Sequence, residues 1–245
     1  MTPCFFAEYY ELELIDMKDD NKNETLTVDE IGDTHMMTSI DTPMTPEAFD
    51  LDDKEKMERI EHYFGKIMET LGLDMTDDSL KGTPKRVAKM YIKDLFNGLD
   101  PQNKPGMATF ENKYQYNRML VEKNITVNSA CEHHFLPIIG NAHVAYISTG
   151  KVIGLSKMNR IVEYYSRRPQ VQERLALQVL NELKEVLQSE HVAVLIEAKH
   201  LCVTTRGIRN EHSTTITAEY SGKFNEPETQ REFLNYINND MMPNK

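Results

Sequence analysis

Cysteine and histidine are the residues of this chain whose types and spacing suggest metal chemistry. Cys131-Glu132-His133-His134 places a thiol and an imidazole three residues apart, so a helical turn or a tight loop would bring them together. A soft thiolate combined with an imidazole is a ligand set that zinc prefers. Cys202 would supply a third ligand and leave a fourth position open, as in catalytic zinc sites. The alternative is that both cysteines are small buried apolar residues, because a single Cys-x-x-His spacing often occurs by chance.

Polar residues alternate around Cys202. Every second position is polar or ligating, in the order His200, Cys202, Thr204 and Arg206. On a strand, such side chains point to the same face of the sheet. A buried face would not hold so many polar groups without partners. We therefore expect this face to line a polar site.

A second group of residues has the chemistry of an anion site. Gly154-Leu155-Ser156-Lys157 precedes a predicted helix, and Arg160 lies one turn further on. With Ser156 as the N-cap, the free N–H groups of the first turn would attract phosphate. Lys157, Arg160 and Arg206 would add positive charge. An ordinary capped helix with solvated cations is the alternative.

Gln172 and Glu173 lie in a sequence rich in arginine, with Arg167, Arg168 and Arg174 close by. The Glu173 carboxylate could accept two N–H bonds from the edge of a guanine, or it could pair with these arginines. The periodicity of the sequence does not decide between the two.

The spacing of apolar residues predicts the elements that must position these side chains. Helices are predicted from Asp53 to about Gly72 and, with Thr83 as N-cap, from Pro84 to Gly98. Strands at 119–127 and 141–148 then flank the Cys131 motif. Helices at 156–166 and 170–187 and strands at 192–203 and 213–220 complete the chain. The order helix, helix, β-β-α-α-β-β predicts an α+β fold with an antiparallel sheet.

Charge divides the chain near residue 53. The formal net charge is −11, but residues 1–53 hold 15 acidic and 2 basic side chains, and the other 192 residues hold 24 acidic and 26 basic ones. We interpret 1–53 as an acidic N-terminal extension that is flexible or folds against a partner subunit. Residues 54–118 form an N-terminal helical region and residues 119–245 a catalytic region in this interpretation. The body is close to neutral, so the total charge does not exclude an anionic substrate.

Composition also excludes several classes of protein. No apolar stretch approaches the roughly 20 residues that cross a bilayer, so no membrane partner is expected. The acidic balance argues against a general nucleic-acid binder. Three cysteines are too few and too odd in number for a disulfide framework, which favours the reducing cytoplasm.

Four blocks occur in order along the chain: TPKRVAKMY (83–91), CEHHFLP (131–137), VIGLSKMNRIVEYYSRRPQVQERL (152–175) and HLCVTTRGI (200–208). Together they resemble the GTP cyclohydrolase I family, and the resemblance runs from about residue 55 to the C-terminus. It implies a T-fold preceded by two helices, assembled as a homodecamer with active sites between subunits. It also implies that zinc assists the conversion of GTP and water into 7,8-dihydroneopterin triphosphate and formate, the first step of pterin synthesis.

The resemblance assigns roles to individual residues. It implies zinc ligands at Cys131, His134 and Cys202 and catalytic histidines at His133 and His200, with His200 protonating N7 of the purine. Guanine recognition falls on Gln172 and Glu173, and triphosphate and ribose contacts fall on Ser156, Lys157, Arg160 and Arg206. Ser156 would also assist the ribose rearrangement, and a neighbouring subunit would supply Arg86 and Lys89. Two other classes stay open: a T-fold relative acting on another purine or pterin, and a non-catalytic zinc scaffold with His143 or His212 as a fourth ligand.

Overall fold

A five-stranded sheet forms the centre of the part of the chain that the structure describes. The computed structural model describes residues 39–206 and 209–238, which belong to one compact unit, Ser39–Lys245. The strands follow the order β5-β2-β3-β6-β7, with bounds Pro169–Gln170, Met119–Cys131, Pro137–Ile147, Val192–His200 and Thr215–Tyr220. Neighbouring strands are antiparallel except β2 and β5, which pair in parallel at Cys131 and Gln170. A separate two-stranded sheet pairs β1 (Thr109–Glu111) with β4 (Lys151–Ile153).

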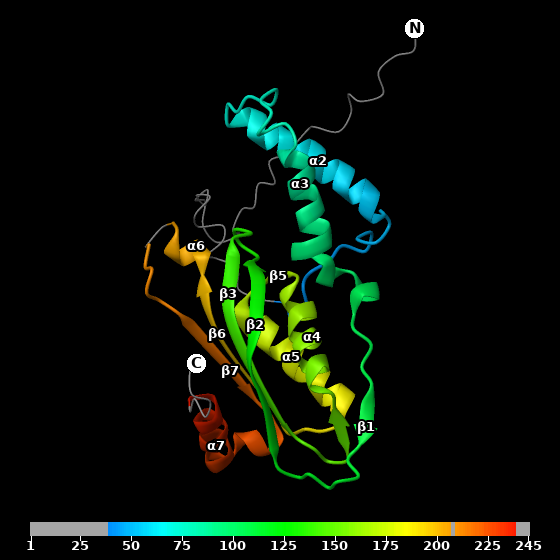
Figure 1. Cartoon of the computed structure of the whole chain (residues 1–245), viewed down its shortest axis with the longest axis vertical. Helices are drawn as coiled ribbons and strands as arrows, with labels where there is room; N and C mark the ends of the chain where they lie inside the picture. Colours follow the sequence, from blue (N-terminus) through cyan, green and yellow to red (C-terminus); the bar gives the residue numbers. More distant parts are fainter. Residues whose placement is uncertain (1–38, 207–208, 239–245) are drawn as a thin grey trace, which may run out of the picture. The chain divides into compact units, whose positions relative to one another are not determined.

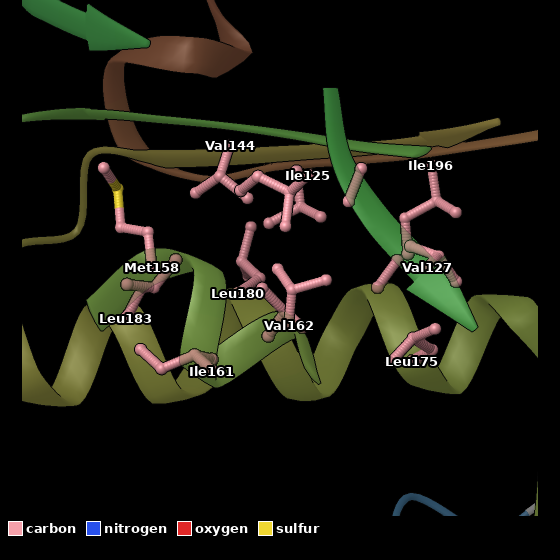
Figure 2. Close-up of a cluster of buried hydrophobic side chains, with 14 of the residues drawn as sticks. Ile125, Val127, Val144, Met158, Ile161, Val162, Leu175, Leu180, Leu183 and Ile196 are labelled. Carbon is pink, nitrogen blue, oxygen red and sulfur yellow. The ribbon is translucent and has the colours of Figure 1, made fainter. Parts of the chain in front are cut away.

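Two helices, α4 (Leu155–Ser166) and α5 (Gln172–Leu187), lie side by side on one face of the sheet (Figure 1). Their apolar side chains face those of the strands and fill the main core, in which Val162, Leu175 and Leu180 lie opposite Val144 and Ile196 (Figure 2). Each fully buried aliphatic side chain contributes about 1.5–3 kcal/mol to the stability of this packing. The core thereby fixes the ends of β2, β6 and α5 relative to one another.

A second apolar cluster lies at the C-terminal end of the described chain. The short helix η4 (Gly222–Asn225) and α7 (Pro227–Asn238) contribute Phe224 and Phe233, both fully buried. These rings pack against each other and against Ile147 and Leu195 of the sheet. The cluster anchors the C-terminal helix to the strands.

The N-terminal helices precede the sheet. In α2 (Asp53–Thr70), Asp52 and Glu55 form a reciprocal capping box. Helix α3 (Thr83–Met90) packs on α2 and continues as the π-helix η1 (Tyr91–Leu95) and the short turns η2 (Asn97–Leu99) and η3 (Pro101–Asn103). The N–H of Gly98 donates to the carbonyl of Arg167, which ties this region to the end of α4.

The structure confirms the α+β prediction, with the order β2-β3-α4-α5-β6-β7 after two helices. Three details of the sequence interpretation are wrong. The strand predicted over 192–203 ends at His200, and Leu201–Thr204 is the helical turn α6. Ser156 is not an N-cap, because α4 begins at Leu155 with Gly154 in the cap position. Thr83 likewise lies inside α3, whose N-cap is Gly82.

The domain boundaries proposed at residues 53 and 118 stay predictions. Most of the acidic extension lies outside the described residues, but 39–53 are described and continue directly into α2. None of the helices in the described ranges is long and apolar enough to cross a membrane.

Candidate active site

A tight loop between β2 and β3 holds the Cys131 motif. The N–H of Cys131 donates to the carbonyl of Leu136, and the N–H of Phe135 donates back to the carbonyl of Cys131, both at 2.8 Å. Phe135 has a φ of 53°, in the left-handed region that closes such a turn. The loop therefore places the side chains of residues 131–134 at one end of the sheet. We call residues 131–136 the metal loop.

Cys131, His134 and Cys202 form a cluster of possible metal ligands. One ligand atom of each lies within 4.8 Å of the others, and Cys131 is buried. Cys202 reaches the loop from α6, directly after the end of β6. Among residues 39–206 and 209–238, no fourth His, Cys, Asp or Glu joins this group, so neither His143 nor His212 does. Two thiols and one imidazole are a donor set that suits zinc and leave one position for a water molecule or substrate.

The surroundings of the cluster change the acidity of its members. Burial, followed by the neighbouring Cys131 thiol, raises the pKa of Cys202 to about 11. Burial, followed by the charge of Arg206 and the neighbouring His133 ring, lowers the pKa of His134. The guanidinium of Arg206 contacts Nε2 of His134 directly. A cation bound between the sulfurs would favour their thiolate form, since metal ligation deprotonates thiols.

His200 is the last residue of β6, two positions before Cys202, and its ring contacts the side chain of Gln172. The distance from His200 Nε2 to Gln172 Oε1 is 2.8 Å. The amide nitrogen of Gln172 donates to the carbonyls of Ile196 and Thr215 at 3.1 and 3.0 Å, which fixes the orientation of the amide. Gln172 Oε1 must then accept from Nε2–H of His200, leaving Nδ1 as the other protonation site. Burial lowers the pKa of His200, and the charge of Glu173 acts in the opposite direction.

The structure separates the roles of Gln172 and Glu173. Gln172 is only 1% exposed and its side-chain polar atoms are bonded inside the protein. Its side chain is thus engaged within the protein, and its part in guanine recognition stays a prediction from the resemblance. Glu173 is exposed at the first turn of α5, close enough to His200 to affect its pKa, and its carboxylate is accessible to a ligand.

His133 and Glu132 lie on the metal loop itself. His133 Nδ1 is 3.5 Å from Cys131 Sγ, so this histidine flanks the ligand cluster. Glu132 forms an ion pair with Arg174, at 2.5 Å from Oε2 to Nη1, and its Oε1 lies 3.9 Å from His133 Nε2. The sequence interpretation did not single out Glu132 or recognise Arg174 as its partner. No periodic signal marks this pair, because it joins a loop to a helix 42 positions later.

Of the predicted anion group, Arg206 contacts the metal loop, but Ser156, Lys157 and Arg160 do not meet it within one chain. Helix α4 runs alongside β2: Asn159 donates to Glu122 near the start of the strand, and the Arg168 carbonyl after the helix accepts from Ser129 near its end. The side chains of Ser156, Lys157 and Arg160 therefore start at the far end of β2 from Cys131. Nine residues of strand separate Glu122 from Cys131, roughly 25–30 Å. Figure 1 shows β1, beside the start of α4, at the opposite end of the sheet from α6.

Arg86 and Lys89 lie on α3, and both are exposed. Arg86 donates to Thr83 Oγ1 and to the carbonyl of Ser79, so its guanidinium is held near the start of its own helix. No contact joins either side chain to the metal loop in the described part of the chain. The structure thus brings together residues 131–134, 172–173, 200, 202 and 206, and it leaves the other predicted cations apart.

Comparison with known proteins gives one consistent result. A family model described as GTP cyclohydrolase I matches residues 60–238. A curated relative from Flavobacterium johnsoniae named GTP cyclohydrolase 1 is 59% identical over 213 residues, which cover 87% of this chain and 96% of the relative. Relatives of the same name from Aeromonas salmonicida and Vibrio vulnificus are each 49% identical over 196 residues, covering 80% of this chain and 89% of theirs.

Proposed function

The chain belongs to the GTP cyclohydrolase I family, and we propose that it opens the imidazole ring of GTP at the metal loop. The products are formate and, after rearrangement, 7,8-dihydroneopterin triphosphate. One observation carries this proposal: Cys131, His134 and Cys202 form a three-ligand cluster, and the half-buried His200, bonded to Gln172, lies two residues before Cys202 in the chain. A non-catalytic zinc scaffold is less well supported, because it would need a closed site with a fourth ligand.

We assign zinc as the metal that these three residues hold. When bound, zinc supplies a Lewis acid that lowers the pKa of a water molecule toward neutrality. The protein's contribution is to keep both thiols and the imidazole within reach of one ion and to keep one side of it open. Because both cysteines must stay reduced to bind it, a reducing compartment such as the cytoplasm suits the enzyme.

In this proposal His200 is the acid that protonates N7 of the purine. Gln172 accepts from Nε2–H of His200, so the exchangeable proton is carried on Nδ1. Gln172 is neutral and offers the imidazolium no opposite charge, whereas burial disfavours the charged ring. A proton placed on Nδ1 is therefore released readily to a basic nitrogen near neutral pH. Gln172 acts as a positioning residue in this scheme.

Glu173 and His133 complete the half of the site that one chain provides. The exposed carboxylate of Glu173, at the first turn of α5, can accept two N–H bonds from the guanine edge and orient the base. His133 flanks Cys131 from the other side of the loop and is placed as the second acid or base for ring opening and formate release.

The other half of the site requires a second copy of the chain. Ser156, Lys157 and Arg160 carry the chemistry for a triphosphate and for the ribose, yet they lie roughly 25–30 Å along β2 from the metal loop. We propose that a neighbouring subunit presents them, with Arg86 and Lys89, to the GTP bound at the first subunit. The homodecamer that the resemblance implies would create such shared sites.

Both edges of the sheet are suited to this assembly. In the described residues, β7 pairs only with β6, and β5 pairs with just two residues of β2. Long unpaired edges are templates for pairing with another chain.

The experiment that tests the function is incubation of the zinc-loaded protein with GTP. We expect stoichiometric formate and a pterin that fluoresces after oxidation. The Cys202→Ser variant should lose bound zinc and formate release together, because one of three ligands is removed. Absence of formate and pterin from the zinc-loaded chain would refute the proposal, and an active, metal-free Cys202→Ser variant would refute the ligand assignment.

A further inference from the structure

The first described residues of the acidic extension are bonded to the helix that supports the metal loop. The Nε of Arg174 donates to the carbonyl of Ser39 at 2.8 Å. Two residues later, Asp41 Oδ1 accepts from Gln178 Nε2, also at 2.8 Å. Both helix residues lie on α5, one turn apart, and both are buried. The segment Ser39–Asp41 therefore covers polar groups of α5 that would otherwise need another partner.

Arg174 connects this segment to the metal loop. It is 4% exposed, and two of its nitrogens bind the Glu132 carboxylate, at 2.5 Å for Nη1 and 3.4 Å for Nη2. Such two-point pairs fix the plane of the carboxylate. The third nitrogen, Nε, has the Ser39 carbonyl as its acceptor. Because Glu132 lies between Cys131 and His133, holding its side chain holds the loop.

The contacts close into a ring. The N–H of Glu132 donates to the carbonyl of Gln170 at 3.0 Å. The Gln170 amide donates to Gln178 Oε1 at 2.7 Å, and Gln178 donates to Asp41. The backbone connects Asp41 to Ser39, and the hydrogen bond from Arg174 to the Ser39 carbonyl completes the ring. Every link of this ring is a hydrogen bond, an ion pair or a short stretch of backbone, so loosening one link loosens its neighbours.

We propose that Ser39–Asp41 and Arg174 position the metal loop through Glu132, so that the acidic extension supports metal retention. The inference rests on the proposed function, since it assumes that the loop holds zinc. Arg174 and Asp41 do not touch the ligand atoms and act as positioning residues. Outer groups that orient metal ligands typically change metal affinity by about 10–100-fold when they are removed.

Zinc release from the full-length chain to a chromophoric chelator tests this proposal without using activity. Arg174→Lys keeps the charge but cannot make the two-point pair, and we expect it to weaken zinc retention by about 10–100-fold. Asp41→Ala removes one hydrogen bond at an exposed residue, so the fold should be kept and retention should fall about fivefold. Asp41→Asn keeps an oxygen that can accept from Gln178, so this variant should retain zinc like the unsubstituted chain.

Asp50→Ala is the matched control, because Asp50 is exposed in the same extension and its side chain has no hydrogen bond or ion pair among the described residues. It should retain zinc like the unsubstituted chain. If Asp41→Ala also does so, the role of the extension is refuted while the proposed function stands. A fall shared by Asp41→Asn and Asp50→Ala would indicate a general charge effect and would also refute it. Failure of the unsubstituted chain to hold zinc would overturn both proposals.

Discussion

Two histidines of this protein, the half-buried His200 and the buried His143, have neutral hydrogen-bond partners. His200 faces the amide oxygen of Gln172, and His143 on β3 accepts a hydrogen bond at Nδ1 from the N–H of Asn124, at 3.5 Å. Burial is the largest influence on both and lowers their pKa values. For His143 the charge of Glu197 opposes this shift and that of Lys123 adds to it. A lowered pKa suits an acid at the site, but it makes the folded state sensitive to low pH.

We predict that the free energy of unfolding falls as pH decreases through the lowered pKa of His143. The unfolded chain binds a proton more readily at this histidine than the folded chain, so stability is present above the ordinary pKa and lost below it. Each unit of lowering corresponds to about 1.4 kcal/mol. In urea titrations from pH 8 to pH 5, His143→Asn should show a shallower decline.

The matched control for this prediction is His62→Asn, which removes an exposed histidine of α2. Its decline should equal that of the unsubstituted chain. Equal declines in all three proteins would show that His143 does not link folding to pH.

At the scale of elements, the core was predictable and the ends of elements were not. Leu175, Val179 and Leu183 repeat at four-residue spacing and occupy the buried face of α5, as the sequence predicts. The alternation around Cys202 predicts a longer β6, but β6 pairs with β3 only up to His200, because β3 starts at Pro137 after the metal loop. Without a partner strand, residues 201–204 form a turn with internal hydrogen bonds. Register between strands is a long-range property that local alternation does not contain.

The site shows the same division between local and long-range information. Ligand types and spacing predict the Cys131, His134 and Cys202 cluster, which the folded chain brings together. The support of that cluster by Arg174 and by Gln172 was missed, because it depends on which residues α5 buries against other elements. Nothing in the local sequence distinguishes the buried Arg174 from an arginine exposed to solvent.

Gly98 controls how closely the N-terminal helices approach α4. A Cβ atom at this position would lie 2.1 Å from the Tyr164 carbonyl oxygen and 2.8 Å from that of Arg167. We predict that Gly98→Ala forces the two elements apart and destabilises the protein by about 1–3 kcal/mol, as overpacked sites generally do. Thermal unfolding measures the effect. Gly106→Ala is the control, because a Cβ atom at residue 106 meets nothing within 4 Å. Its stability should stay within about 0.5 kcal/mol of that of the unsubstituted chain. A similar loss of stability in both variants would contradict the packing argument.

At the scale of the whole molecule, the charge of −11 belongs mainly to residues 1–53, and the remainder is near neutral. Lys157 and Arg160, at the start of α4, lie at the far end of β2 from the metal loop of their own chain, and Arg86 and Lys89 are exposed on α3. A single chain therefore presents its metal ligands at one end of the sheet and the cations of α4 at the other. Assembly with other copies is the arrangement that can unite the two.

Subunit complementation tests this arrangement directly. Cys202→Ser damages the metal half and Lys157→Ala the cation half, so each variant alone should have little GTP-dependent formate release. Co-expressed one to one, they should form mixed assemblies in which roughly a quarter of the shared sites are intact. The matched control combines Cys202→Ser with His134→Ala, both in the metal half, and should recover nothing. Mixed assemblies, verified by differently tagged subunits, that recover no more activity than this control would show that one chain builds the whole site.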